Sequence, residues 1–431
     1  MWHGSTKPFY VIVEIGTACD FGMMDAVVSS LRDRYTLVFI SSGTRVVANA
    51  DIKVEYQIPE AVIKQPDEAT AMLGMGVVHK LWHVLSHLFT TGVGFYVDYM
   101  RMSSTLTRLI KDTVAKYKPE GVLAHCGVAM QLLASRVFTT YPSALVYFAP
   151  GFLPNHQIPF AFDARIKDDN VNIYDANPAF DYTASGFLYQ DEIKYLAGIG
   201  NRDYHYLSLI HHINAFAPPL VPDVTYSDKL PSLRVTSLGM LRPRTPPGIS
   251  KKLPETLRQW VGTRKRPPII FVTFGSFDHL LSQTFITTLI RSLIKYAARK
   301  KLRVLVRAPS TRVLDEVPEL HDRRPRGVCY VTHDYVPYRA LVQYCELVCF
   351  TGSVCLQNEC WYQKCNMLFV PLLSEQYLWA KLYRHHTGVP FIDHLTYDFG
   401  TVRDTILAAH AYSDPEFFEV VQQSFSNDLF R

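Results

Sequence analysis

The chain is poor in charge and contains no long hydrophobic run. Charged residues make up 19% of its 431 residues, while 48% are hydrophobic. Such a composition excludes intrinsic disorder for most of the chain. No uninterrupted apolar run reaches ~20 residues, so no membrane-spanning helix is predicted. The 44 basic and 39 acidic side chains leave a net charge of only +5. Since no basic stripe stands out, nucleic acid is not an expected partner.

Secretory and metal-binding signals are also absent. The segment 1–8 lacks a charged region followed by an apolar one, and no Asn-x-Ser/Thr acceptor occurs in the chain. None of the eight cysteines belongs to a Cys-x-x-Cys pair. The five between Cys345 and Cys365 are spaced too widely for a typical zinc site, and we expect core thiols. These features together predict a cytoplasmic protein without a metal.

Apolar strands alternate with amphipathic helices in the first half of the chain. The run 9–16 predicts a buried strand, 22–34 a helix and 35–43 a second strand. Further strands are expected at 121–124 and 144–148. This alternation is typical of a parallel sheet covered by helices on both faces.

A stretch rich in proline and basic residues interrupts the alternation. We interpret 241–268 as an interdomain linker, with its basic clusters exposed to solvent. The alternation then restarts, with strands expected at 269–274, 302–306, 328–331, 346–350 and 367–370. The sequence thus predicts an α/β protein with two Rossmann-like domains facing each other across a cleft. Ligands would bind at the carboxyl ends of the strands.

Two strand ends in the second half carry a glycine and hydroxyl side chains. The tetrapeptides 273–276 and 350–353 each follow a predicted strand, and each is expected to open a helix. Backbone N–H groups at such a turn, together with the helix dipole, can hold a phosphate. Either turn alone could equally be an ordinary capped helix. Two neighbouring turns of this kind are more informative, because a diphosphate needs two cradles.

Three further places in the second half could bind a nucleotide and a sugar. Glu359 lies two turns into the second helix, where a carboxylate could reach ribose hydroxyls. Glu375 and Gln376 follow another strand end, and a carboxylate beside an amide can contact several sugar hydroxyls. Tyr335 is placed to stack on a flat base. Structural interpretations stay open, with Glu359 as a solvent-facing helix charge and Tyr335 as an ordinary buried ring.

The order and spacing of these residues resemble the UDP-dependent glycosyltransferases of the two-Rossmann type called GT-B. Their donor signature runs from aromatic-x-Pro-Gln through a His-Gly-Gly turn to a Glu and finally an Asp-Gln. Here 335–338, 351–353, Glu359 and 375–376 stand at those places, and from the turn onward the spacing is that of the family. The resemblance implies a UDP-sugar donor held without a metal in the second domain. The implied donor-binding residues are Ser276, Tyr335, Val336, Thr351, Gly352, Ser353, Glu359, Glu375 and Gln376.

The first half adds a match to the sterol and antibiotic branch of that family. The segment 16–21, Gly-Thr-Ala-Cys-Asp-Phe, is similar to the Gly-Thr-Arg-Gly-Asp-Val opening of that branch. The resemblance implies that Asp20 is the base acting on the acceptor hydroxyl. Other branches have a His there, oriented by a carboxylate after a later strand, and His125 occupies that later place. The implied pair is therefore reversed, and either member could carry the proton. His125 could equally be a structural strand-end histidine.

The resemblance also implies how the chain is divided. Residues 1–240 would bind the acceptor, and residues 269–400 would bind the UDP-sugar. Residues 401–431 would form a carboxyl-terminal helix that packs back on the first domain. The implied reaction is an inverting transfer of a hexose, with glucose the first candidate, to a lipophilic hydroxylated acceptor such as a sterol.

Several residues depart from the family signature. Thr351 replaces the phosphate-binding His, Ser353 the second Gly, and Tyr338 the Gln. Backbone N–H groups do not depend on these side chains, so the turn could still hold phosphate. The departures leave open an altered sugar, a weakened site or a lost one. A catalytically degenerate protein that binds nucleotide or a partner is the alternative function, and a sugar-nucleotide epimerase on the same fold is a third.

The segment 71–100 is rich in aromatic residues and methionine, which would suit an adaptable apolar acceptor pocket. A core-facing helix, or peripheral membrane contact near Trp82, explains it equally well. His79, His83 and His87 recur every four residues on one helix face. No nearby cysteine or carboxylate completes a metal set, so we expect no metal there.

Overall fold

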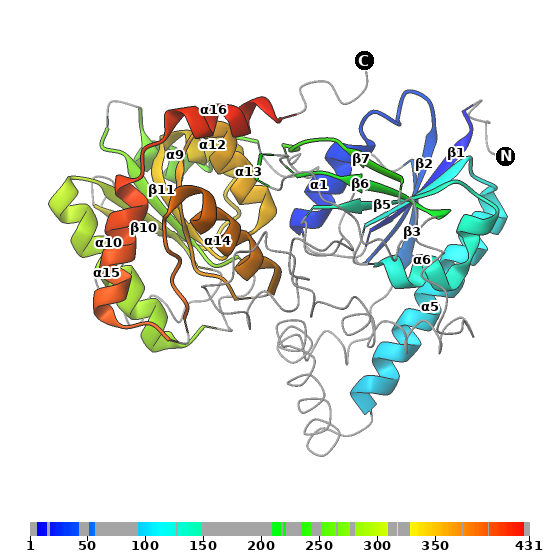
Figure 1. Cartoon of the computed structure of the whole chain (residues 1–431), viewed down its shortest axis with the longest axis horizontal. Helices are drawn as coiled ribbons and strands as arrows, with labels where there is room; N and C mark the ends of the chain where they lie inside the picture. Colours follow the sequence, from blue (N-terminus) through cyan, green and yellow to red (C-terminus); the bar gives the residue numbers. More distant parts are fainter. Residues whose placement is uncertain are drawn as a thin grey trace. The chain divides into compact units, whose positions relative to one another are not determined.

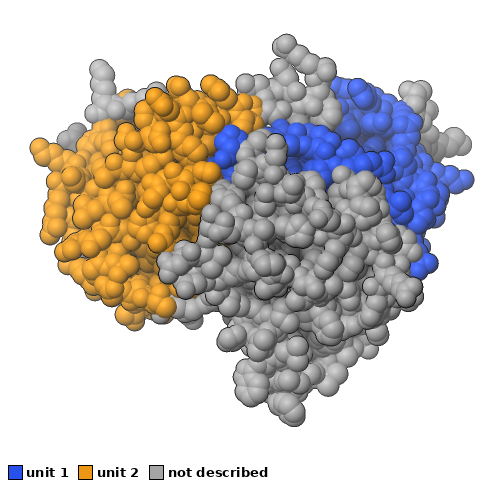
Figure 2. Space-filling view, in the orientation of Figure 1, with its two compact units in different colours: residues 1–247, 426–431 blue, residues 248–425 orange. Residues whose placement is uncertain are grey.

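The computed structural model divides the chain into two compact units. Unit 1 covers residues 1–247 and 426–431, and unit 2 covers residues 248–425 (Figure 2). The structure describes residues 7–14, 18–42, 51–56, 94–125, 128–148, 209–216, 219–220, 234–242, 251–263, 266–275, 281–308, 317, 328–372, 374–394 and 396–425. Each unit contains one parallel sheet and several helices (Figure 1). The predicted α/β fold class is therefore confirmed.

The sheet of unit 1 has the strand order β3-β2-β1-β4-β5-β6-β7, with every neighbouring pair parallel. Its strands are β1 (Phe9–Glu14), β2 (Thr36–Ser42), β3 (Ile52–Tyr56), β4 (Gly121–His125), β5 (Ser143–Tyr147), β6 (His211–Asn214) and β7 (Arg234–Ser237). The chain extends the sheet from β1 to β3 on one side and then returns to add β4 on the other side of β1. This is the order of a Rossmann-like fold.

Burial in this sheet follows strand position. All five residues of β5 are buried, while the edge strand β7 is mostly exposed. The edge strand β3 alternates, with its lysine and glutamate exposed. The apolar runs predicted four of these strands to within about two residues. They missed β3, β6 and β7, because edge and short strands do not need continuous apolar sequence.

Helices of unit 1 cover the inner strands. They are α1 (Ala18–Val28), α5 (Gly94–Tyr117) and α6 (Ala129–Ser135). The helix α1 contacts β1, and α5 packs against α6 and β1. The predicted helix at 22–34 therefore begins four residues earlier and ends at Val28, where a turn leads into β2. Of the aromatic stretch 71–100, only the backbone of 94–100 lies within the described residues, as the start of α5.

The sheet of unit 2 has the order β10-β9-β8-β11-β12, again all parallel. Its strands are β8 (Ile269–Thr273), β9 (Arg303–Arg307), β10 (Cys329–Thr332), β11 (Cys345–Phe350) and β12 (Asn366–Phe369). All five strands were predicted to within about one residue. Their long apolar side chains are buried, as in Phe271, Phe350 and Phe369.

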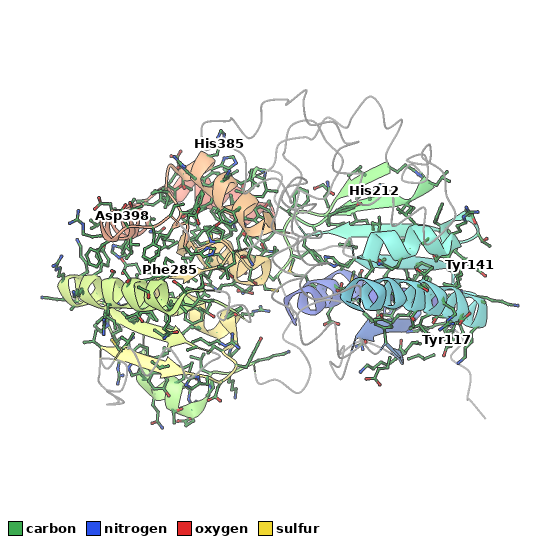
Figure 3. The ribbon with its side chains drawn as sticks, turned by 90° about the horizontal axis from the view of Figure 1, so that it is seen from below. Tyr117, Tyr141, His212, Phe285, His385 and Asp398 are labelled. Carbon is green, nitrogen blue, oxygen red and sulfur yellow. The ribbon has the colours of Figure 1, made fainter. Side chains whose placement is uncertain are left out.

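Helices of unit 2 pack on this sheet and on one another. The unit contains α9 (Glu255–Val261), α10 (Gln283–Lys300), α12 (Tyr338–Leu341), α13 (Val354–Gln363), α14 (Ser374–Thr387), α15 (Phe399–Ala411) and α16 (Pro415–Gln423). The helices α10 and α15 lie side by side, and α13 packs against α16 (Figure 1). Phe285, labelled in Figure 3, joins the start of α10 to Tyr397 through an edge contact of 4.7 Å between ring centroids. No described helix is long and apolar enough to cross a bilayer.

The carboxyl-terminal segment contacts unit 2 through its described residues. The helix α15 packs on β12, and the rings of Phe417 and Phe418 in α16 contact Trp361 of α13 at 5.7 and 5.4 Å. Residues 426–431 are grouped with unit 1 but lie outside the described residues. The predicted packing of this tail on the first domain stays a prediction.

Five of the six cysteines of unit 2 are buried, as expected of core thiols, and Cys345 at the start of β11 is half-buried. Cys349, Cys360 and Cys365 are fully or almost fully buried. Burial raises the pKa of the Cys349 thiol, and burial together with Cys365 raises that of Cys360. Such thiols stay protonated and are poor nucleophiles.

Part of the predicted linker is folded. Leu257, Trp260 and Val261 are spaced along one face of α9 and are buried. Arg303, at the start of β9, holds the end of this helix by donating to the carbonyls of Trp260, Val261 and Pro267 at 2.6, 3.1 and 2.9 Å. The Arg303 guanidinium also lies 4.7 Å from the centre of the Trp260 ring. Residues 255–261 are therefore an element of unit 2 rather than a solvated tether.

Replacing Arg303 by methionine should lower the free energy of unfolding by about 3 kcal/mol, because the buried carbonyls lose a charged donor. Urea denaturation measures the loss. Arg258→Met on the same helix is the control, since the Arg258 side chain is 61% exposed and its ion pair with Glu255 stabilises little. Equal stability of the two variants would contradict the role assigned to Arg303.

Candidate functional site

The strand order of each sheet locates the candidate site. In unit 2 the chain moves from β8 to β9 and β10, then returns to place β11 on the other side of β8. In parallel α/β sheets, ligands generally bind outside the carboxyl ends of the two strands between which the order reverses, here β8 and β11. The same reversal in unit 1 lies between β1 and β4.

The turn after β8 exposes its backbone. Gly275 has a φ of +66°, and a Cβ atom built on it would meet no atom within 4 Å. The Gly275 N–H donates to the hydroxyl of Thr273 at 3.3 Å, which shapes the turn. Ser276 lies outside the described residues. The helix expected to open there begins at Gln283 instead, because Ser282 caps it by accepting from the N–H of Phe285.

The turn after β11 is more tightly built. Gly352 has a φ of +105°, and a Cβ there would lie 3.2 Å from the Cβ of Gln376. Ser353 is the N-cap residue of α13 but makes no side-chain capping bond to that helix. Backbone N–H groups in the first turn of a helix are anion-binding groups in general. In the register of the sheet, Phe350 of β11 lies beside Thr273 of β8, so the two glycine turns are neighbours.

The predicted side chains around these turns are largely buried. Thr351 is 3% exposed and Glu359 is 1% exposed. The Glu359 carboxyl therefore has little solvent contact, contrary to the interpretation of a solvent-facing helix charge. The side-chain oxygen of Gln376 accepts from the N–H of Leu372 at 2.8 Å, which ties the start of α14 to the loop after β12. Glu375 lies in the first turn of α14, and its side chain is outside the described residues.

Tyr335 occupies the loop after β10 at the same edge. It is 38% exposed, whereas its neighbour Val336 is fully buried. Two bonds hold the loop, from the N–H of Asp334 to the Thr332 hydroxyl at 3.1 Å and from the Arg307 guanidinium to the Asp334 carbonyl at 3.3 Å. The interpretation of Tyr335 as an ordinary buried ring is therefore wrong. An exposed ring on a braced loop is suited to stacking.

In unit 1, His125 ends β4 and faces an acidic residue. Its Nδ1 lies 3.7 Å from Oε1 of Glu14, the last residue of β1. Its ring stacks on Phe148, with ring centroids 5.2 Å apart and an angle of 23° between the planes. Asp20 lies in the first turn of α1, and its side chain is outside the described residues. The pairing of Asp20 with His125 therefore stays a prediction.

Sequence reasoning missed Glu14. A signal was present, since a glutamate ending an otherwise apolar strand run is unusual for a buried strand. A second histidine contact also lies in this sheet, where the Tyr147 hydroxyl and Nδ1 of His212 are 3.0 Å apart (Figure 3 labels His212). His212 is fully buried in β6, so this pair joins β5 to β6 inside the sheet.

Among the described residues, no group of three or more His, Cys, Asp or Glu side chains is arranged to hold a metal ion. His79, His83 and His87 lie outside that part of the chain. The expectation that the site works without a metal therefore stays a prediction.

Comparisons with known proteins find similarity in structure only. No protein-family model and no curated protein matches the sequence. The glycosyltransferase of kitacinnamycin matches 97% of this chain and 95% of its own, with 15% identity and a TM-score of 0.61. UGT2 of Phytolacca americana, complexed with UDP-2-fluoro-glucose and pterostilbene, matches 99% of this chain and 94% of its own, with 12% identity and a TM-score of 0.58. VinC, a glycosyltransferase in complex with dTDP, matches 97% of this chain and 94% of its own, with 14% identity and a TM-score of 0.56.

These similarities extend over nearly the whole of each chain. At such low identity they establish the fold and leave the activity to be argued from the site. The strand orders of both sheets agree with that assignment. The chain has the GT-B fold, with two Rossmann-like units.

The Gly352 turn can be tested without any ligand. Gly352→Ala should lower the free energy of unfolding by about 2–3 kcal/mol, because the alanine would combine a positive φ with a contact of 3.2 Å to Gln376. Gly388→Ala is the control, since it has a φ of +72° and open space, and should cost about 1 kcal/mol. Urea denaturation compares the two. Equal losses would show that the Gln376 contact does not constrain the turn.

Proposed function

We propose that the chain transfers a sugar from a nucleoside-diphosphate donor to an acceptor hydroxyl. The observation that carries the proposal is the pair of adjacent glycine turns at the strand-order reversal of unit 2. Both turns have positive φ, and one of them opens a helix. Backbone N–H groups in this arrangement suit two linked phosphates. The fold supports the proposal, because structures that share it were solved with UDP-2-fluoro-glucose, UDP or dTDP.

The donor would be a UDP-sugar, with a hexose such as glucose as the transferred group. Its base would stack on the exposed ring of Tyr335, and the backbone of Val336 would contact the base edge. The diphosphate would lie at Ser276 and at the turn of Thr351, Gly352 and Ser353. Since backbone groups do most of this work, the loss of the family's phosphate-binding His at Thr351 is tolerable.

The sugar and ribose would be held by side chains around the second turn. Glu359 would bind ribose hydroxyls. Its 1% exposure means that the nucleotide must displace neighbouring groups to reach it. Glu375 and Gln376 would bind the sugar. Because the Gln376 oxygen already accepts from Leu372, its contribution would come from the amide NH₂.

The acceptor would be a lipophilic hydroxylated molecule such as a sterol, bound by unit 1. A base in that unit, Asp20 or His125, would take the hydroxyl proton as the oxygen attacks the anomeric carbon. The transfer would invert the configuration of that carbon. The helix N-terminus of α13 would stabilise charge on the departing diphosphate.

The degenerate alternative is favoured by one observation. Thr351 stands where the family has its phosphate-binding histidine, and a threonine side chain adds no positive charge to the turn. It is also only 3% exposed. A protein of this kind would bind nucleotide without transferring sugar. The two functions differ in a measurable way, because only a transferase releases UDP when an acceptor is added.

Nucleotide binding tests the donor site. Calorimetry with UDP, dTDP and UDP-glucose should show binding, with UDP preferred. Tyr335→Ala should weaken UDP binding by about 5- to 150-fold, because stacking on an aromatic ring contributes about 1–3 kcal/mol per base. Tyr335→Phe should retain most of the affinity, since it keeps the ring.

Phe399→Ala is the control, because this ring is 56% exposed at the start of α15 and plays no part in the proposal. UDP release is then followed with UDP-glucose and a hydroxylated apolar acceptor. Absence of nucleotide binding would refute the proposed donor site. Binding without acceptor-dependent release would favour the degenerate protein.

A further inference from the structure

A glutamate is buried at the carboxyl end of β1. The side chain of Glu14 is fully buried, although it ends a strand whose preceding residues are apolar. Removing an ionised carboxylate from water costs several kcal/mol unless a partner of opposite charge or a hydrogen-bond donor compensates. A strand end could hold an apolar residue at no such cost. A partner that compensates the buried carboxylate of Glu14 is therefore expected nearby.

The neighbouring strand supplies that partner. β1 and β4 are adjacent and parallel, and their register pairs Val13 with Ala124, so the next residues are Glu14 and His125. The Glu14 Oε1 lies 3.7 Å from Nδ1 of His125. At 3.7 Å the two atoms are in ion-pair range but beyond hydrogen-bond distance. Hydrogen bonds of catalytic groups are often long without substrate and shorten when it binds.

The ring of His125 is held from a second side. Phe148, which follows β5, stacks on it with an angle of 23° between the rings. Within the described part of the chain, Glu14 of β1 is an acidic group and Phe148 an aromatic group that face His125. Tyr147 of β5 is engaged with His212. The stacking on Phe148 orients the plane of the imidazole, and Nδ1 faces the Glu14 carboxyl.

The pair also lies at the strand-order reversal of unit 1. The sheet order places β1 beside β4, and these are the strands between which the chain changes direction. Ligands of parallel α/β sheets bind outside the carboxyl ends at this point. The His125 side chain is 14% exposed, whereas that of Glu14 is wholly buried. Histidine is therefore the member of the pair that a substrate can reach.

We propose that Glu14 is the positioning residue for His125 and that His125, rather than Asp20, is the base that acts on the acceptor hydroxyl. This inference rests on the proposed transfer reaction. Glu14 holds a proton on Nδ1, which leaves the lone pair of Nε2 directed away from β1. The carboxylate also stabilises the imidazolium that forms when Nε2 takes up a proton.

The proposed reaction transfers one proton and the sugar in a single displacement. His125 Nε2 takes the proton from the acceptor hydroxyl while the hydroxyl oxygen forms a bond to the anomeric carbon. The bond between that carbon and the diphosphate oxygen breaks, and its electron pair leaves with the nucleoside diphosphate. The imidazolium, paired with Glu14, then passes its proton to water.

The pair is tested first by an NMR titration of the His125 ring in the full-length protein, with His125→Asn used to assign its signal. In Glu14→Gln the His125 pKa should fall by about one pH unit or more, because a carboxylate within about 4 Å favours the imidazolium. In Glu14→Asp the His125 pKa should fall less, because the shorter side chain keeps the carboxylate charge. Tyr147→Phe is the control and should leave the His125 titration unmoved. An unchanged His125 pKa in a folded Glu14→Gln protein would overturn the proposal.

Kinetics then test the role in transfer. Glu14→Gln should lower kcat by about 100-fold or more with the affinity for UDP unchanged, and the acidic limb of the kcat/KM pH profile should move with the His125 pKa. Full activity in His125→Asn would overturn the proposal and return the role of base to Asp20. A His125 titration that depends on Glu14 in a protein without transfer activity would instead refute the proposed function, while the pair itself stands.

Discussion

Parallel pairing of buried strands is the constraint on which the rest of this structure depends. A strand such as β5 or β8 is enclosed on both faces, so all of its side chains are buried. Most of the polar groups of the inner strands lie at or near the strand ends. The candidate site residues accordingly lie at the carboxyl edges of the sheets. The reversal of strand order then selects one place on each edge, between β1 and β4 in unit 1 and between β8 and β11 in unit 2.

The carboxyl edges of the two sheets offer different chemical groups. Unit 2 offers backbone, in the form of an open turn at Gly275 and a constrained turn at Gly352 that opens α13. Unit 1 offers a carboxyl–imidazole pair, in which the fully buried Glu14 lies 3.7 Å from the partly accessible His125. Backbone N–H groups suit a diphosphate because they carry partial positive charge without needing a particular side chain. A proton transfer, by contrast, requires a titratable side chain held in one orientation.

The turn after β11 is defined by backbone rather than by particular side chains. The positive φ of Gly352 and the start of α13 at Val354 set its course, whichever side chains Thr351 and Ser353 supply. Polar contacts elsewhere in the unit serve structure. Arg303, for example, anchors α9 by donating to the carbonyls of Trp260 and Val261. The sequence did not predict this helix, because its surroundings are rich in proline and basic residues.

The sequence by itself determined the fold class and the strands of both sheet centres, because continuous apolar runs are required wherever a strand is covered on both faces. It also located the glycine and hydroxyl residues that follow β8 and β11. The sequence did not predict the edge strand β7 or the start of α10 at Gln283, since short exposed strands and local caps leave weak patterns. Only the tertiary structure decided that Glu14 meets His125. These residues are separated by more than a hundred positions, and strand register, a property of the assembled sheet, brings them together.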